Sequence, residues 1–329
     1  MTLTTFTDAS LTTLTVTGNN NVVVTALTDT VGSAFTFTDS NSHVVDIQAF
    51  EVTSAPTITI TNSGTGTLVI GDLTGLGSSA LTSLTLNGAV DFTMSADAAT
   101  SGTTINAAGD NAAISIALEG TASGNTDTVT LGNGNDYVKT AGSGTENITL
   151  GNGGTAATPN KVDLSGSTAV DHVVVGNGMN NVILGDGSAQ ETVTFATHTN
   201  SASFYDTVTL TDTNASFTTS TATTATSVST TSLYIVKGLQ AGDQVALPVA
   251  TDSLALAANL AGANGEALLA HGTYNASAGT FTYNANGGDT LLTYDTINSS
   301  SHAFSSVVLV GFSASSASTM QYNGAILLG

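Results

Sequence analysis

Short runs in which threonine alternates with leucine, isoleucine or valine recur through the first third of the chain. Typical examples are LTTLTVTG (11–18), TLVIG (67–71) and LTSLTLNG (81–88). Alternation with a period of two and an abundance of β-branched residues indicate β-strands, and each run ends at a residue that favours a turn. Many short strands of similar length and spacing predict either a β-sandwich or a β-solenoid. The repeated phrase L-T-x-L-T-x-x-G favours the solenoid.

The charge balance excludes several kinds of partner. Three lysines stand against 24 acidic residues in a chain of 329 residues, which gives a net charge of -21. A surface so poor in cations cannot neutralise phosphates, so we expect neither nucleic acid nor an anionic membrane as a partner. Cysteine is absent, which excludes disulfides and thiol chemistry. Cations are the natural counter-charge of this chain.

A glycine-rich block beginning near Ser123 carries the strongest chemical signal. Its stretch TLGNGNDYVKTAGSGTENITLGNGG (130–154) sets glycines close to carboxylates. A phosphate-binding loop would need a lysine directly after its glycines, and a dinucleotide fingerprint would need a third glycine that opens a helix. Neither is present, because Asp136 and the strand-like Tyr137-Val138-Lys139 follow the glycines. Phosphate binding is therefore disfavoured.

The block follows a nine-residue register. The nonapeptide G-G-x-G-x-D-x-U-x, in which U is a large aliphatic residue, builds a parallel β-roll that binds calcium in its turns. Placing the acid at Asp136 puts Gly132 and Gly134 on glycine positions and Val138 on U. The pattern recurs with substitutions, one inserted residue and one longer insertion. The positions that we expect to form calcium sites are Asp127, Gly132, Gly134, Asp136, Gly142, Gly144, Glu146, Gly151, Gly153, Asp171, Gly176, Gly178, Asn180, Gly185, Gly187 and Glu191.

Each position in the register has a physical role. Glycine permits a tight, partly left-handed turn whose carbonyls point inward. Calcium takes six to eight oxygen ligands, typically carboxylates and carbonyls. Alternate turns of a roll lie on the same edge, so acids about eighteen residues apart should share an ion. Asp127 with Glu146, and Asp171 with Glu191, meet this spacing approximately.

The register resembles that of the repeats-in-toxin (RTX) family of calcium-binding, type I-secreted bacterial proteins. The copies are degenerate, with Leu131, Leu150, Val175 and Leu184 in place of the first glycine. With the threonine-rich runs, the scarcity of lysine and the terminal GTFTYNANGGDTLLTYD and SSVVLVG, the chain is similar to the C-terminal part of RTX-type surface-layer proteins.

This resemblance implies a structural protein of the bacterial cell surface that folds and assembles into a lattice on binding several calcium ions. Its partners would be other copies of itself, the type I secretion machinery and a cell-surface polysaccharide bound through a region outside this chain. In that family an uncleaved C-terminal signal directs export, so the lack of a signal peptide in MTLTTFTDAS is expected. No apolar run has the length of a membrane helix, so we expect no membrane insertion.

We expect an all-β chain in three parts. Residues 1–121 should form a threonine-rich parallel β-solenoid, residues 122–199 a degenerate RTX calcium-binding β-roll, and residues 200–329 a smaller β-rich domain with the secretion signal. The alanine- and leucine-rich Leu254–Ala270 is the one segment that suggests a helix.

Three alternatives stay open. The Gly-Asn turns could join strands without any metal. An enzyme is disfavoured, because the motifs H-E-x-x-H and G-x-S-x-G are absent and the histidines at positions 43, 172, 198, 271 and 302 are scattered. His172, next to Asp171, is most simply a surface histidine. Threonine ladders could instead serve an adhesin or an ice-binding module, although the T-x-T phrases recur at a varying step.

Overall fold

All regular secondary structure that the structure describes is β-strand. The computed structural model describes residues 1–30, 34–52, 55–74, 81–97, 102–185, 190–201, 203–211, 217–218, 227–229, 233–248, 253–257, 266–295, 303–315, 317–320 and 325–329. Within these residues, no helix has the length and apolar character needed to cross a membrane. The chain divides into two compact units, Met1–Val162 and Asp163–Gly329.

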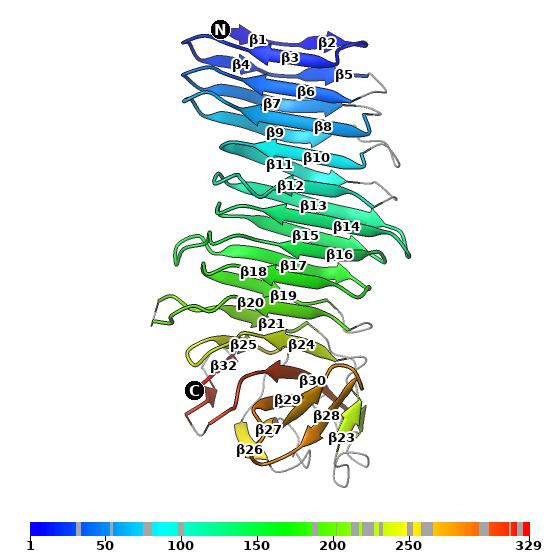
Figure 1. Cartoon of the computed structure of the whole chain (residues 1–329), viewed down its shortest axis with the longest axis vertical. Helices are drawn as coiled ribbons and strands as arrows, with labels where there is room; N and C mark the ends of the chain where they lie inside the picture. Colours follow the sequence, from blue (N-terminus) through cyan, green and yellow to red (C-terminus); the bar gives the residue numbers. More distant parts are fainter. Residues whose placement is uncertain are drawn as a thin grey trace. The chain divides into compact units, whose positions relative to one another are not determined.

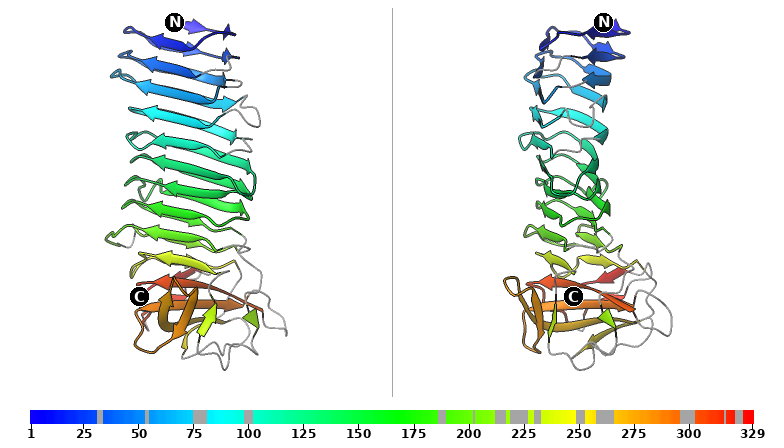
Figure 2. Two further views of the ribbon diagram at one scale, coloured as in Figure 1. Left: turned by 45° about the vertical axis from the view of Figure 1, so that its right-hand side comes forward. Right: turned by 90° about the vertical axis from the view of Figure 1, so that its right-hand side faces the viewer.

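The N-terminal unit is built from two parallel sheets, whose strands follow one another as stacked coils (Figure 1). Sheet A contains β1 (Thr2–Leu3), β2 (Phe6–Asp8), β4 (Val22–Val24), β5 (Leu27–Asp29), β7 (Val45–Val52), β9 (Leu68–Thr74), β11 (Val90–Asp97), β13 (Ile114–Thr121) and β15 (Tyr137–Gly142). Sheet B contains β3 (Thr13–Val16), β6 (Phe35–Asp39), β8 (Thr57–Asn62), β10 (Ser83–Asn87), β12 (Thr104–Ala107), β14 (Thr126–Leu131) and β16 (Thr145–Thr149). The chain passes from one sheet to the other and back in each coil, and Figure 2 shows these coils one above another.

The alternation of the sequence explains the core of this unit. Residues of one parity point between the sheets and stack in register, as Val45 does on Leu68 and Leu68 on Val90. These side chains are fully buried, and the rings of Phe35 and Phe50 meet with centroids 5.5 Å apart. Burying each such side chain contributes about 1.5–3 kcal/mol, so the stacked interior is the main source of stability.

The C-terminal unit begins with the same parallel stacking and ends in antiparallel strands. Its strands are β17 (Asn160–Ser167, in which the division between the units falls), β18 (His172–Val175), β19 (Asn180–Ile183), β20 (Thr192–Phe195), β21 (Thr207–Thr209), β22 (Phe217–Thr218), β23 (Ser227–Ser229), β24 (Tyr234–Lys237), β25 (Gln244–Ala246), β26 (Ser253–Ala257), β27 (Glu266–Asn275), β28 (Thr280–Tyr283), β29 (Asp289–Asp295), β30 (Ala303–Val310), β31 (Thr319–Met320) and β32 (Ala325–Leu327).

Two parallel series start this unit, β18–β20–β24 and β19–β21–β25. The antiparallel strands β27, β29 and β30 then enclose a second apolar cluster, which is formed by Leu233, Ile235, Ala270, Phe281, Leu291 and Val308.

The prediction of an all-β chain with a parallel β-solenoid is confirmed. The nine-residue calcium roll and the secretion signal stay predictions, and the expected boundaries at residues 121 and 199 differ from the division into compact units within β17. The expectation of a helix in Leu254–Ala270 is wrong for the residues described there, which lie in β26 and β27. In β27, Ala267 to Ala270 are all buried. A strand that is apolar on both faces has the same composition as a buried helix.

Candidate functional site

Buried polar residues occupy the corners where the chain enters the strands of sheet A. In the N-terminal unit, the Val90 N–H donates to both oxygens of the Asp110 carboxylate, at 3.2 and 3.1 Å. One coil later, the Ile114 N–H donates to Asp136 Oδ1 at 3.2 Å, and the Asp136 N–H donates to Asn160 Oδ1 at 3.0 Å. Each side chain thus satisfies a backbone donor of the preceding coil, and the corners join coil to coil.

The acids expected to share ions are neighbours on adjacent coils within each unit. In the N-terminal unit, Asp127 is the register partner of Glu146, and both are buried. In the C-terminal unit, the Thr192 N–H donates to the Asp171 carbonyl oxygen at 2.8 Å, which sets Glu191 beside Asp171. The acids of each predicted pair are therefore neighbours, and an ion shared between them stays a prediction.

The Gly-Asn-Gly turns stack directly on one another. The Gly151 N–H donates to the Gly132 carbonyl oxygen at 2.9 Å, and the Asn152 N–H donates to Asn133 Oδ1 at 2.8 Å. A Cβ atom would lie 2.2 Å from Gly132 O at Gly151, and 1.6 Å from the carbonyl oxygen of the preceding coil at Gly153. Close approach of the coils therefore requires glycine at these positions.

The expected left-handed turns are wrong for all but one of the described candidate glycines; Gly132, Gly134, Gly151 and Gly153, for example, have no positive φ. Only Gly142 among the described candidates has one, at 122°. The turn glycines are needed for space between coils rather than for an unusual backbone conformation. Gly187 lies outside the described residues.

An amide nitrogen occupies the corner at Asn180. Its Nδ2 atom donates to the carbonyl oxygens of Gly176 and Gly178, at 3.1 and 2.7 Å, and to Asp206 Oδ1 at 3.0 Å. These carbonyls are among those that the nonapeptide pattern assigns to an ion. The amide therefore supplies a donor where a calcium ion would supply charge, and this corner is satisfied without a metal. At Gly185 the N–H donates to both Glu191 carboxylate oxygens, at 2.9 and 3.0 Å.

Asp136 lies in a corner where no cationic group acts on its carboxylate. Its Oδ2 atom is buried and has no hydrogen-bond partner. Burial raises the pKa of Asp136 to about 7, the Ile114 N–H opposes this, and the nearby Asp110 carboxylate raises it further. Burial also raises the pKa of Asp110. None of the groups acting on these two carboxylates is cationic, so the pair has a buried oxygen and uncompensated negative charge.

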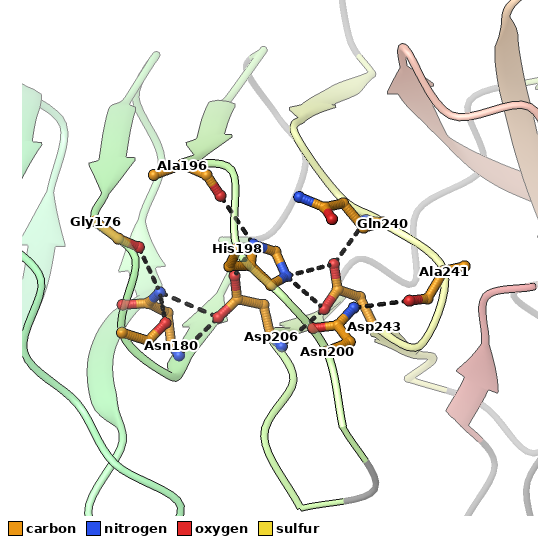
Figure 3. A network of polar contacts seen from close by, with 10 residues as sticks. Gly176, Asn180, Ala196, His198, Asn200, Asp206, Gln240, Ala241 and Asp243 are labelled. Atoms are coloured by element: carbon orange, nitrogen blue, oxygen red, sulfur yellow. Dashed lines mark hydrogen bonds and ion pairs between the residues drawn. The ribbon is translucent and has the colours of Figure 1, made fainter.

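The C-terminal unit contains a cluster that the sequence did not reveal. His198, Asp206 and Asp243 are all buried, and their polar atoms converge (Figure 3). His198 Nδ1 lies 2.8 Å from the Ala196 carbonyl oxygen, and Nε2 lies 3.0 and 3.2 Å from the two oxygens of Asp243. Asp206 Oδ2 is 3.4 Å from Nδ1. The Asp206 N–H in turn donates to Asp243 Oδ1 at 2.9 Å.

This cluster contains its own cation. Both ring nitrogens of His198 face oxygen atoms, and an imidazolium, which donates from both nitrogens, satisfies this arrangement. Burial alone would lower the pKa of His198, but the Ala196 carbonyl, the hydrogen bond to Asp243 and the charges of Asp243 and Asp206 raise it overall. Three such groups in proximity could suggest a metal site. A doubly protonated imidazole has no lone pair for a metal, and we assign His198 as the counter-charge of the two acids.

Histidine 198 was missed because a single histidine with no partner nearby in the sequence gives no signal. A less strict sequence pattern would have identified Asp206 and Asp243. Asp206-Thr-Val and Asp243-Gln-Val repeat the acid–x–valine phrase of Asp136-Tyr-Val, as does Asn160-Lys-Val with an amide. The hydrogen-bonded corner pairs are 24 residues apart for Asp136 and Asn160, 26 for Asn180 and Asp206, and 37 for Asp206 and Asp243, so a register of nine does not reach them.

No family model, curated protein or solved structure matches the chain.

The glycine corners give a first prediction. Replacing Gly153 with alanine should lower the free energy of unfolding by about 1–3 kcal/mol, because the new methyl group would overlap a carbonyl of the preceding coil. Gly109→Ala is the matched control, since a Cβ there meets nothing within 4 Å. Thermal unfolding followed by circular dichroism measures both variants. Equal melting temperatures for the two would show that coil spacing does not require this glycine.

The imidazolium gives a second prediction. His198→Gln should destabilise the C-terminal unit by about 3 kcal/mol, because it leaves two buried carboxylates without a cation. The pKa of His198 is raised on folding, so its contribution is complete below about pH 6.5 and is lost as the pH rises through the higher folded value. The difference in free energy of unfolding between wild type and variant should therefore be largest near pH 6 and shrink at alkaline pH.

Hydrogen exchange of peptides covering 198–209 and 240–246 locates this effect. The exposed His172→Gln is the control for the loss of a histidine in the same unit. A difference between wild type and His198→Gln that grows with pH would exclude the imidazolium.

Proposed function

We propose that the chain is a calcium-stabilised structural protein of a bacterial surface layer, exported by a type I pathway and folded outside the cell. The observation that carries this proposal is the contrast between two pairs of buried acids. Asp206 and Asp243 have His198 between them, whereas Asp110 and Asp136 have no cationic side chain acting on them. A bound cation is the simplest source of the missing charge.

The donors at this corner suit calcium. Asp110 and Asp136 offer carboxylate oxygens, one of them buried without a hydrogen bond, and the stacked turns offer backbone carbonyls. Calcium is a hard cation that prefers this set of oxygens. When bound, it would supply positive charge and hold Asp136 in its ionised form. Asp127 with Glu146, and Asp171 with Glu191, are the further candidate pairs.

Calcium would make folding conditional on the compartment. A net charge of -21 opposes compaction where calcium is scarce, as in a cytoplasm. Outside the cell, sites with dissociation constants of roughly 10⁻⁴–10⁻³ M fill. Each site at a tenfold excess of calcium adds about 1.4 kcal/mol, and a few such sites equal a sizeable part of the stability of a typical domain. Calcium between the acidic sheet A surfaces of neighbouring copies would then join them into a lattice, and a polysaccharide would anchor it through a region outside this chain.

Calcium dependence is tested first. The wild-type melting temperature should rise on replacing excess EGTA with millimolar calcium, and Asp136→Asn should show a smaller rise because one charge needing compensation is gone. Asparagine is tolerated, since Asn160 and Asn180 occupy equivalent corners. Asp8→Asn, an acid near the surface in β2, is the matched control and should respond like wild type. Identical wild-type melting in calcium and in EGTA would contradict the calcium proposal.

Lattice formation is a separate prediction. Electron microscopy of the folded protein incubated with calcium should show two-dimensional sheets that disperse on adding EGTA. If the protein binds calcium and folds, yet stays monomeric at every calcium concentration, the calcium site is supported and the surface-layer function is contradicted.

A further inference from the structure

The outward face of sheet B is a regular array of threonines. A central column runs across all seven strands, each residue being the register partner of the next: Thr13, Thr36, Thr59, Thr85, Asn106, Thr130 and Thr149. A second column on one side contains Thr57, Ser83, Thr104, Thr128 and Asn147. A third on the other side contains Thr15, Thr38, Thr61 and Asn87. We call these three columns the threonine face.

The register holds although the sequence step does not. The sequence separation from Thr36 to Thr59 is smaller than that from Thr59 to Thr85, yet both pairs are register partners. The varying step of the T-x-T phrases therefore does not disturb the array. LTSLTLNG, which has no T-x-T phrase, still provides one rung through Ser83, Thr85 and Asn87.

The threonine face carries no charge, in contrast to the opposite side of the same unit. All outward positions of the seven strands of sheet B are threonine, serine or asparagine. The outward positions of sheet A include Asp46, Glu51, Asp72, Asp91 and Lys139. The chain has a net charge of -21, so acidic residues on its other surfaces already keep it soluble. Solubility therefore does not explain why one entire sheet face lacks carboxylates.

The array is also rigid. Beneath it, Phe37, Ile58, Leu84 and Ile105 are fully buried between the sheets. Asn87 Nδ2 donates to Thr61 Oγ1 at 3.3 Å and links two rungs. Neighbouring strands are about 4.8 Å apart and alternate residues about 6.7 Å apart along a strand, so the face presents a fixed mesh of hydroxyl and methyl groups.

Most classes of ligand do not suit this face. Nucleic acids and anionic lipids need cations, which are absent from it. Metal ions need carboxylates. Protein interfaces depend on buried aromatic or arginine anchors, and sugars stack on aromatic rings, but the face has none of these side chains. A neutral, periodic partner that needs only hydroxyl and methyl contacts is left.

We propose that the threonine face binds crystalline ice. Its mesh of about 4.8 by 6.7 Å is of the same order as the spacing between water molecules in ice, so hydroxyl groups can take lattice positions while the methyl groups exclude mobile water between them. The partner is thus ordered water rather than a macromolecule. This binding is independent of the proposed lattice function, and it requires only that sheet B is folded.

The test uses calcium-saturated protein in assays of ice recrystallisation and thermal hysteresis. Wild type should shape growing crystals and inhibit recrystallisation. Thr59→Lys and Thr85→Lys, in the central column, should need about tenfold or more protein for the same effect, because an ammonium group on the face must lose its hydration to meet ice. Thr93→Lys is the matched control, since Thr93 points outward from sheet A, and it should keep wild-type activity.

Circular dichroism of each variant separates a lost face from a lost fold. Thr59→Val and Thr59→Ser further separate the hydroxyl from the methyl contribution. Folded wild-type protein that leaves ice growth unchanged would overturn the proposal, as would Thr59→Lys and Thr85→Lys with the activity of Thr93→Lys. Either result could occur with calcium-dependent folding intact, so failure here is distinguishable from failure of the proposed function.

Discussion

The structure depends on parallel stacking of coils in register, which sets each residue beside its counterpart about 4.8 Å away. For apolar residues this repetition is favourable, as in the buried column of Val45, Leu68 and Val90. For buried acids it is costly, because two like charges at that distance repel by about 3 kcal/mol at an effective dielectric constant of 20. Every polar corner must therefore reduce or compensate charge, and the chain does so in different ways.

Two solutions to this constraint are visible. Asparagine replaces the acid at Asn160 and Asn180, where an amide keeps the hydrogen bonds without the charge. An imidazolium is inserted between Asp206 and Asp243. At Asp110 and Asp136 neither device is found. What distinguishes this corner is the lack of a cationic group acting on the carboxylates, because the pKa of Asp206 is raised to about 7 just as that of Asp136 is. We propose calcium at the Asp110–Asp136 corner because the other corners hold a protein group in the same place. That group is an asparagine amide at Asn160 and Asn180, and the His198 ring between Asp206 and Asp243.

Much of the fold could be predicted because a single periodicity, the alternation of apolar and polar residues every two positions, determines it. Alternation fixed the strand type, and the nonapeptide identified Asp136 and the neighbours Asp127 and Glu146. It also identified Asp171 and Glu191 as neighbours. A fixed step of nine does not reach the other corners, because segments of differing length separate them. His198 meets Asp243 across 45 residues, and nothing local marks that contact. The role of the turn glycines also required the structure, since close approach of two backbones does not show in a sequence.

The threonine face and the apolar core are two consequences of one register. Along β8, Thr57, Thr59 and Thr61 point outward while Ile58 and Ile60 are buried. A slip of one residue would expose the isoleucines and bury the threonines, so the packing of the core fixes the outward array. Loops can then vary in length without displacing either. The regularity of the face is thus maintained by the free energy of core burial, and a neutral, periodic surface can persist on a chain whose loops are irregular.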